Sequence, residues 1–346
     1  MRALTVRPGV ANSISLETVA EPSPSEGAVL VQALALGICG TDREIAAGLY
    51  GWAPPGQDRL ILGHESLGRV LDAPEGSGFA KGDLVAGIVR RPDPVPCSAC
   101  AQDAWDMCRN GLYTERGIKQ RHGYGSEHFR VEPTFLIKID PALGVLGVLL
   151  EPTSVVAKAW DHVQRIGNRA PGWKPECVLV TGAGPIGLLA AMIGAQQGLA
   201  IHVLDRNTDG PKPALVRALG GTYHTGFDDL RPDIVMECTG ANAVVLDVLD
   251  RAAPGGVVCL TGVSSGGRKM PFDVGAHNRQ MVLDNHVVFG SVNANRSHYA
   301  AAAEALARAD RKWLEGLITR RVPLARWQEA LERRPDDIKV IVDFTA

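Results

Sequence analysis

The sequence carries almost no excess of charge of either sign. Its 346 residues contain 36 lysines and arginines against 38 aspartates and glutamates, a net charge of −2, and these charges are scattered rather than clustered. Proteins that bind nucleic acid or a membrane surface through charge normally concentrate basic residues on one stretch or face. The balance therefore argues against nucleic acid and membranes and favours a small-molecule partner.

A long apolar stretch is missing from the N-terminal segment MRALTVRPGV, and the seven cysteines form an odd set. Neither feature is typical of a secreted, disulfide-bonded protein, so we expect a reducing, cytoplasmic location. One run, 177–204, is free of charged residues and long enough to span a bilayer. The glycines of TGAGPIG and the polar Gln196-Gln197-Gly198 interrupt it, which favours a strand, a turn, a buried helix and a second strand.

The length favours two domains, since globular chains average about 150 residues per domain. Residues 1 to about 150 hold short apolar runs such as AVLVQALAL and DLVAGIV between turn residues, which predicts a largely β-structured half. From about residue 154, strand-like runs alternate with helix-like ones, the pattern of a doubly wound parallel sheet in an α/β domain. Helices and a closing strand, KVIVDF, are expected after about residue 295.

A glycine-rich segment, GAGPIG, follows the strand-like run CVLVT and precedes a helix-like run. In that setting Gly182 permits a tight turn, Gly184 lets a pyrophosphate approach the backbone, and Gly187 lets helix and strand pack closely. The helix that begins at Pro185 and Ile186 offers unpaired N–H groups to the phosphate. The segment therefore predicts a dinucleotide site.

The next strand ends at Asp205, near the position where dinucleotide-binding proteins place an acid that accepts the adenosine ribose hydroxyls. A carboxylate there repels a 2′-phosphate, which favours NAD. The neighbouring Arg206 favours the opposite choice, because a guanidinium pairs with a 2′-phosphate. We expect NAD, with use of both NAD and NADP as the alternative.

Three residues from separate segments could together hold a metal: Cys39 in GICGTD, His64 in GHES and Glu151 in EPTS. A thiolate, an imidazole and a carboxylate are acceptable ligands for a catalytic zinc that keeps one position open. Each residue alone also fits an ordinary structural role, as a buried thiol, a core histidine or a solvated helix start. Their spacing leaves both interpretations open.

Several segments together resemble the zinc-dependent medium-chain dehydrogenases, and within them the glucose 1-dehydrogenase group. The resemblance covers essentially the whole chain and rests on GICGTDREI, LGHESLGRV, DMCRNGLYTERGIKQRHGYGSE, LLEPTS, TGAGPIG and MVLDNHVVFGSVNANRSHY. It implies a GroES-like, β-rich catalytic domain over 1–153 and 296–346, a Rossmann domain over 154–295, and an active site in the cleft between them.

The resemblance also implies a role for each matching residue. Cys39, His64 and Glu151 match the catalytic zinc ligands, and Glu65 is an alternate or neighbouring carboxylate. Thr41 matches the hydroxyl that contacts the substrate oxygen and passes on its proton.

Asp42 matches the acid that orients the zinc histidine, although a turn residue would give the same pattern. Thr239, Val263 and Asn293 are further predicted cofactor contacts.

The segment from Cys97 to Cys108, CSACAQDAWDMC, resembles the family's structural zinc loop but departs from it. The usual third cysteine is replaced by Asp103, and the gap before the last cysteine is shorter. Cys97, Cys100 and Cys108 with Asp103 or Asp106 could still close a tetrahedral zinc site. A metal-free loop with reduced thiols is the alternative.

The implied substrate is an aldose, whose adjacent hydroxyls need polar partners in a buried site. Glu115 matches a carboxylate that holds sugar hydroxyls, and Asn293 is expected beside the nicotinamide and the sugar. Thr41 and Glu151 complete the predicted substrate contacts.

Two features weaken a claim for glucose itself. Val89 stands where one related enzyme has a sugar-binding asparagine. Arg90 and Arg91 follow it and leave open an anionic group on the substrate.

We therefore expect an enzyme that transfers hydride from the anomeric carbon of an aldose to a nicotinamide cofactor and yields an aldonolactone. A zinc-dependent polyol or secondary alcohol dehydrogenase, which uses the same machinery, is the first alternative. A non-catalytic dinucleotide-binding protein is a remote one. A homo-oligomer, either a dimer or a tetramer, is also expected.

Overall fold

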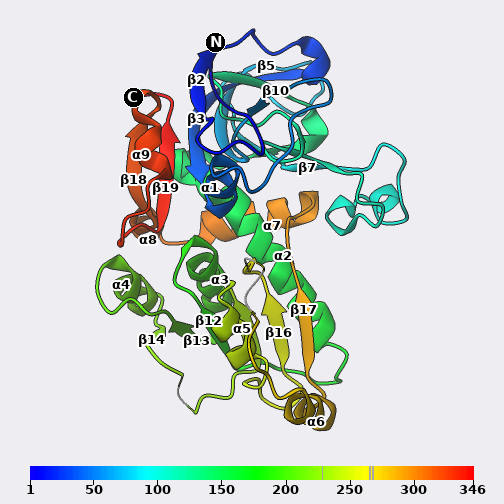
Figure 1. Cartoon of the computed structure of the whole chain (residues 1–346), viewed down its shortest axis with the longest axis vertical. Coiled ribbons are helices and arrows are strands. Elements are labelled where there is room, and N and C mark those ends of the chain that lie inside the picture. Colours follow the sequence, from blue (N-terminus) through cyan, green and yellow to red (C-terminus); the bar gives the residue numbers. More distant parts are fainter. Residues whose placement is uncertain (228, 265, 267–268) are drawn as a thin grey trace. The chain divides into compact units, whose positions relative to one another are not determined.

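The computed structural model places the two kinds of sequence pattern in separate units (Figure 1). It describes residues 1–227, 229–264, 266 and 269–346, and over these residues two units are found. The first unit comprises Met1–Ser154 and Asn293–Ala346, and the second comprises Val155–Val292. Both termini belong to the first unit, so the second unit is an insertion in its chain.

The first unit is built around antiparallel strands, as the short apolar runs predict. Strand β3 (Val29–Ile38) lies at its centre, where it pairs with β5 (Glu65–Asp72), β10 (His128–Val131) and β19 (Lys339–Asp343). Its sequence alternates buried and less buried side chains over the first half, because one face packs on an apolar core that includes Val70. Burying each such side chain stabilises the fold by about 1.5–3 kcal/mol.

The remaining strands extend this sheet or form small sheets beside it. Strands β18, β6 and β11 complete the main sheet; β2-β1-β4 and β7-β8-β9 form the others. Their bounds are Arg2–Val6 (β1), Ser15–Thr18 (β2), Leu60–Ile61 (β4), Leu84–Gly87 (β6), Arg90–Arg91 (β7), Thr114–Arg116 (β8), Gln120–Arg121 (β9), Leu136–Lys138 (β11) and Ile318–Pro323 (β18).

Short helices connect these strands. They are α1 (Gly40–Ala46), α7 (Arg296–Arg308), α8 (Arg311–Leu317) and α9 (Gln328–Leu331), with 3-10 turns at Pro24–Glu26, Cys100–Gln102, Trp105–Met107, Pro133–Phe135, Pro141–Leu149 and Leu324–Arg326. The longer α2 (Leu150–Gly167) begins in the first unit and continues into the second.

The second unit is a parallel sheet with the order β14-β13-β12-β15-β16-β17 over the described residues. The strands are Cys177–Thr181 (β12), Ala200–Leu204 (β13), Thr222–His224 (β14), Ile234–Glu237 (β15), Val257–Leu260 (β16) and Val287–Gly290 (β17); the helices between them are Pro185–Gln196 (α3), Pro211–Ala218 (α4), Asn242–Val248 (α5) and Val274–Asp284 (α6). The strand order proceeds in opposite directions from β12, which creates a switch point between β12 and β15. Open α/β sheets bind ligands at the carboxyl end of such a point.

These observations confirm the expected fold class, a GroES-like β-rich part and a doubly wound Rossmann sheet. The charge-free run 177–204 forms β12, a turn, α3 and β13, as predicted. One helical stretch in the described part, 141–167, is long and apolar enough to cross a membrane by length and composition. Of the most apolar part of this stretch, 72% is buried inside the protein, which is typical of a core helix.

The glycine turn between β12 and α3 offers a test of the packing. A Cβ atom on Gly187 would overlap the carbonyl oxygen of Gly182, whereas a Cβ atom on Gly184 would meet nothing. We predict that Gly187→Ala lowers the free energy of unfolding by about 1–3 kcal/mol, because the backbone must shift. Gly184→Ala is the matched control and should melt as the wild type does. Equal melting temperatures by circular dichroism for both variants would contradict this description of the turn.

Candidate functional site

The pairing of β3 with β5 brings together side chains that are candidate metal ligands. Cys39 follows β3 and caps α1, while His64 immediately precedes β5. The Cys39 Sγ lies 3.1 Å from His64 Nε2. The ligand atoms of Cys39, His64 and Glu65 all lie within 4.8 Å of one another. Sequence reasoning selected all three, and the structure places them in one cluster.

Asp42 fixes the geometry of both Cys39 and His64. Its carboxylate accepts a hydrogen bond from the Cys39 backbone N–H at 2.9 Å, and its other oxygen lies 3.5 Å from His64 Nδ1. The Asp42 side chain is fully buried. Contact with Asp42 through Nδ1 leaves Nε2 directed at the sulfur. Burial disfavours the charged imidazole, but the thiolate of Cys39 and the carboxylate of Asp42 hold the pKa of His64 well above its usual value.

A buried lysine that the sequence did not reveal accompanies the cluster. Lys339, the first residue of β19, forms an ion pair with Glu65, and both side chains are almost fully buried. Its ammonium also donates to the carbonyl of Ile38 at 3.4 Å. The ion pair therefore fixes Glu65 to the strand that leads into Cys39.

Glu151 lies in the first turn of α2 and is 9% exposed. Burial, followed by repulsion from Glu65, raises the pKa of Glu151 to about 7. Its carboxylate is not within 4.8 Å of all the ligand atoms of the cluster. The predicted ligand Glu151 is thus close enough for the charge of Glu65 to change its pKa. Glu65, however, is the carboxylate that lies in the cluster with Cys39 and His64.

The donor set fits zinc. A thiolate, an imidazole nitrogen and a carboxylate facing one another are the soft and borderline ligands that this ion prefers, and three protein ligands leave a position free. Thr41 is partly buried, and its backbone N–H donates to the Cys39 sulfur at 3.2 Å. No protein group in the described part of the chain bonds its hydroxyl, which leaves that hydroxyl available to a ligand.

A second set of polar side chains is centred on Glu115. The antiparallel pairing of β7 with β8 sets Arg90 opposite Glu115, and the guanidinium donates to Glu115 Oε1 at 2.9 and 3.1 Å. Asn293 donates to the same oxygen at 2.8 Å. Within the described residues, Oε2 accepts no hydrogen bond from the protein. Two predicted substrate residues, far apart in sequence, are therefore in direct contact.

Neither neighbouring arginine is free for an anionic substrate group. Arg90 also donates to the carbonyl of Asp106 and stacks on the ring of Tyr113 at 3.7 Å. Arg91 donates to the Ile88 carbonyl at 2.7 Å and pairs with Glu132 at 3.3 Å. These contacts weigh against the phosphate or carboxylate that the sequence left open.

Val89 is 2% exposed and packs in an apolar cluster with Ile45 and Ile118. It therefore forms part of the core of the first unit.

The predicted cofactor residues of the second unit surround the glycine turn. Gly182 has a φ of 91°, a conformation that favours glycine, and Gly184 caps α3, whose first residues are the partly buried Pro185 and Ile186. Asp205 accepts from the N–H of Ala183 at 2.7 Å, so its carboxylate holds the turn.

Asp205 also accepts from the N–H of Asn207 at 3.0 Å and pairs with Lys212 at 3.2 Å. Burial opposes the charge, but these N–H donors and the lysine hold the pKa of Asp205 below its usual value. Arg206 is exposed. Sequence reasoning missed Lys212, because nothing in the pattern showed that the first turn of α4 lies beside the Asp205 carboxylate.

The other predicted cofactor contacts lie on loops that follow the strands. Thr239 is exposed on the loop after β15, and Val263 is 78% exposed after β16. The Thr239 N–H donates to Glu237 at 2.7 Å. Glu237 is fully buried and did not emerge from the sequence, where it resembles the end of an apolar strand.

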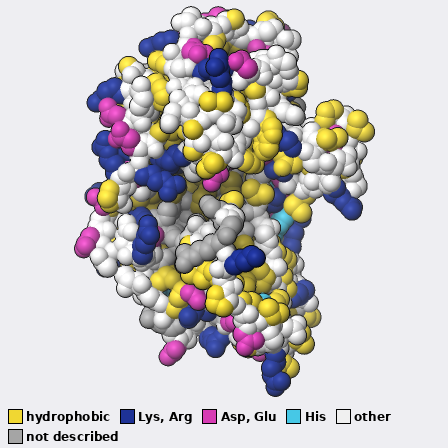
Figure 2. All heavy atoms as spheres, in the orientation of Figure 1, with side chains coloured by type: hydrophobic (Ala, Val, Ile, Leu, Met, Phe, Trp, Pro, Cys, Tyr) yellow, Lys and Arg dark blue, Asp and Glu magenta, His cyan; other side chains and the backbone are white. Residues whose placement is uncertain are grey.

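The segment between β7 and β8, residues 92–113, forms a lobe that extends beside β7 (Figure 1). Figure 2 shows hydrophobic side chains on its surface, where Val95, Met107 and Leu112 are more than half exposed. Trp105 and Cys100 of the same segment are buried, so its apolar side chains are divided between a small buried group and an exposed group.

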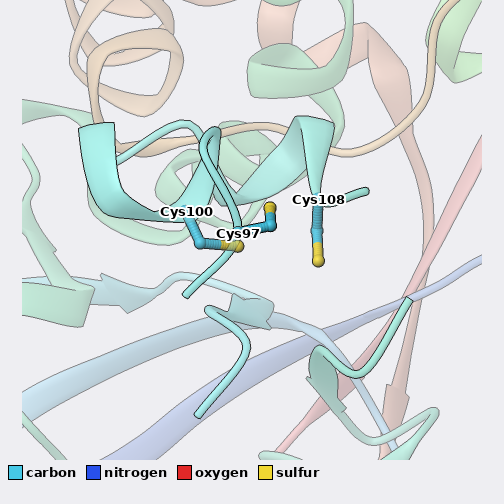
Figure 3. A group of neighbouring side chains, drawn as sticks. All are labelled: Cys97, Cys100 and Cys108. Carbon is cyan, nitrogen blue, oxygen red and sulfur yellow. The ribbon is translucent and has the colours of Figure 1, made fainter. Parts of the chain in front are cut away.

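The sulfur atoms of Cys97, Cys100 and Cys108 lie within 4.8 Å of one another (Figure 3). Backbone N–H groups, led by that of Arg109, lower the pKa of Cys97 to about 6, whereas burial raises the pKa of Cys100 to about 11.

The structure does not bring the two aspartates into this thiol cluster. Asp103 is exposed with a φ of 57°, and Asp106 is buried with an oxygen 3.9 Å from His298 Nδ1. Neither carboxylate is within 4.8 Å of all three sulfurs. The thiol cluster therefore offers three ligands of the four that a structural zinc takes from protein.

Comparisons with known proteins agree with these features. A family model for the glucose dehydrogenase C-terminus matches residues 144–344, and one for the alcohol dehydrogenase GroES-like domain matches residues 25–141. The glucose 1-dehydrogenase of Methanocella arvoryzae is 38% identical over the whole of both chains, and that of Thermoproteus tenax is 41% identical over 99% of both. A structure of Haloferax mediterranei glucose dehydrogenase in complex with NADP, Zn and gluconolactone has a TM-score of 0.92 at 32% identity and covers both chains completely.

Proposed function

Because the chain belongs to the glucose dehydrogenase group of the zinc-dependent medium-chain dehydrogenases, we propose that it oxidises an aldose at the anomeric carbon. Hydride passes to a nicotinamide cofactor and the product is an aldonolactone. The observation that carries the proposal is the cluster of Cys39, His64 and Glu65. The gluconolactone in the Haloferax mediterranei complex supports the choice of an aldose.

Cys39 and His64, with a carboxylate from Glu65 or Glu151, would hold the catalytic zinc. When bound, zinc supplies Lewis-acid polarisation of the substrate oxygen. Asp42 keeps the imidazole oriented, and Lys339 restrains Glu65 through their ion pair. These residues thus form the metal site before substrate arrives, so that little reorganisation is needed.

The chain also provides a route for the proton of the anomeric hydroxyl. The unbonded hydroxyl of Thr41 lies two residues from Cys39 and can accept that proton. Burial and repulsion from Glu65 raise the pKa of Glu151 to about 7. Where Glu65 is the carboxylate that holds the metal, Glu151 is free to take up the proton. Hydride then leaves carbon while the proton leaves oxygen, which balances the two-electron oxidation.

Glu115 and Asn293 are the residues that we assign to the sugar. Oε1 of Glu115 is occupied by Arg90 and Asn293, while Oε2 can accept from substrate hydroxyls. A sugar hydroxyl paired with a carboxylate gains a charge-assisted hydrogen bond. The group therefore suits a polyhydroxylated substrate better than a simple alcohol.

A second zinc in the lobe is also proposed, with Cys97, Cys100 and Cys108 as its ligands. The three neighbouring sulfur atoms support it, because thiolates are ligands of structural zinc sites, whose metal contributes to folding. The fourth ligand is then a group other than Asp103, such as water.

For the cofactor we propose that NAD is preferred, although the Haloferax mediterranei complex contains NADP. The charged carboxylate of Asp205 would repel a 2′-phosphate and accept from ribose hydroxyls. The dinucleotide would lie along Gly182, Gly184 and Gly187, with Thr239 and Val263 as further contacts.

Cofactor reduction, followed by absorbance with aldoses, polyols and simple alcohols, tests the proposed function. We predict turnover of aldoses that chelation abolishes and added zinc restores. His64→Ala should remove one equivalent of zinc and reduce kcat by at least about a hundredfold, because the Lewis acid is lost. His122→Ala, which changes a histidine on the same unit outside the cluster, is the control. Turnover of polyols or alcohols alone would contradict the sugar assignment, and an active zinc-free enzyme would contradict the mechanism.

Replacement of Glu115 tests the sugar contact. We predict that Glu115→Gln lowers kcat/KM for the aldose by roughly tenfold to a hundredfold, because a charge-assisted hydrogen bond is lost. The KM for the cofactor should stay unchanged. Glu132→Gln, which also unpairs a buried arginine, controls for stability. Parallel losses for sugar and cofactor in Glu115→Gln would indicate a folding role instead.

Replacement of Asp205 tests cofactor choice. We predict that Asp205→Ser raises kcat/KM for NADP relative to that for NAD by about tenfold, since the repelled charge is removed and Arg206 and Lys212 remain. Asp209→Ser, on the same loop, is the control. An unchanged ratio would show that Asp205 serves only to hold Ala183.

A further inference from the structure

Glu237 is a buried acid to which the proposed reaction gives no role. It ends β15 and none of its surface is exposed. Among residues with described placement, no cation forms an ion pair with its carboxylate. A buried carboxylate without a cation is costly unless hydrogen bonds replace its hydration. Packing alone therefore does not explain why an acid occupies this buried position.

The loop after β15 supplies most of those hydrogen bonds. The N–H of Thr239 donates to Glu237 Oε1 at 2.7 Å, and the Thr239 hydroxyl donates to the same oxygen. The N–H of Gly240 lies 3.2 Å from both carboxylate oxygens. Gly240 has a φ of 63°. The carboxylate thus holds a tight turn whose first residue is a predicted cofactor contact.

The same side chain reaches the end of β12. The hydroxyl of the fully buried Thr181 donates to Glu237 Oε1 at 3.4 Å. Gly182 follows Thr181 and opens the glycine turn, and a Cβ atom on it would lie only 2.8 Å from Thr239 Cγ2. The glycine turn and the loop after β15 are therefore packed against each other, and both are held by this carboxylate.

The backbone of Glu237 fixes a third loop. Its carbonyl accepts from the N–H groups of Thr261 and Gly262 at 2.8 and 3.0 Å. Gly262 follows β16, and a Cβ atom on it would lie 2.7 Å from Glu237 Oε2. The chain leaves space at this point for the carboxylate, so the loops after β12, β15 and β16 all converge on one residue.

We propose that Glu237 is a positioning residue for the dinucleotide. It joins three loops at the carboxyl edge of the sheet, where doubly wound folds bind this class of ligand. The inference rests on the proposed function, because it takes the cofactor to lie along the glycine turn and Thr239. It adds that the conformation of these three loops depends on the buried Glu237 carboxylate, which does not itself touch the cofactor.

Direct cofactor binding tests this role. The dissociation constants of NADH and NADPH are measured through the fluorescence of the bound nicotinamide, on zinc-loaded protein whose folding is checked by circular dichroism. Glu237→Gln keeps the size and shape of the side chain. It replaces the carboxylate oxygen Oε2 with an NH2 group, a donor that faces the Gly240 N–H. We expect the dissociation constant to rise about tenfold, with unchanged zinc content and unchanged aldose KM at saturating cofactor.

Three further variants separate positioning from folding. Glu237→Asp retains the charge and should restore part of the affinity. Thr181→Val leaves the carboxylate in place, removes one donor and should weaken binding about threefold even if Glu237→Gln does not fold. Glu176→Gln makes the same chemical change on an exposed residue just before β12 and should bind as the wild type does.

The outcomes are distinguishable. Folded Glu237→Gln and Thr181→Val proteins with wild-type dissociation constants would overturn the inference while the proposed function stands. A fall in melting temperature with no change in affinity would do the same, because it would show a purely structural role. A wild-type protein that binds neither cofactor would overturn the proposed function, and this inference with it.

Discussion

The pairing of β3 with β5 is the constraint on which the proposed metal site depends. The register sets Gly37 opposite Glu65, so the residues just beyond each strand, Cys39 and His64, meet at the same place. A Cβ atom on Gly37 would collide with the Glu65 carboxylate. A shift of one residue would turn these side chains to opposite faces of the sheet. The apolar side chains that fix the register therefore also fix the distance between sulfur and imidazole.

Charge balance is the second constraint on this centre. Cys39, Asp42, Glu65 and Glu151 can all carry negative charge. The buried groups that can carry positive charge are Lys339, which pairs with Glu65, and His64, whose pKa is held well above its usual value. Such an arrangement favours a bound cation, because unpaired buried charges are costly. Burial and the charge of Glu65 raise the pKa of Glu151 to about 7. The excess of acidic groups that would favour a cation also raises this pKa while no cation is present.

The sequence predicted local features well and contacts between distant segments poorly. The glycine turn, Asp205, Cys39 and His64 are recognisable because each lies in a short motif whose context is visible along the chain. Lys339 and Glu237 were missed because each resembles part of an apolar strand, and their partners become evident only when strands pair. Asp103 was chosen by its place in a cysteine pattern, but it lies at a left-handed turn and its carboxylate is not within 4.8 Å of all three sulfurs. Motifs thus show which chemistry is present, whereas pairing and loop packing decide which residues meet.

The metal centre itself is the central claim, and crystallography at the zinc absorption edge tests it most directly. Crystals of the zinc-loaded protein would be measured on both sides of the edge, and anomalous difference maps would locate each ion. We predict a peak bonded to Cys39 Sγ and His64 Nε2, with a carboxylate oxygen of Glu65 or Glu151 as a third ligand. A protein that turns over aldose while zinc appears only between Cys97, Cys100 and Cys108 would contradict it.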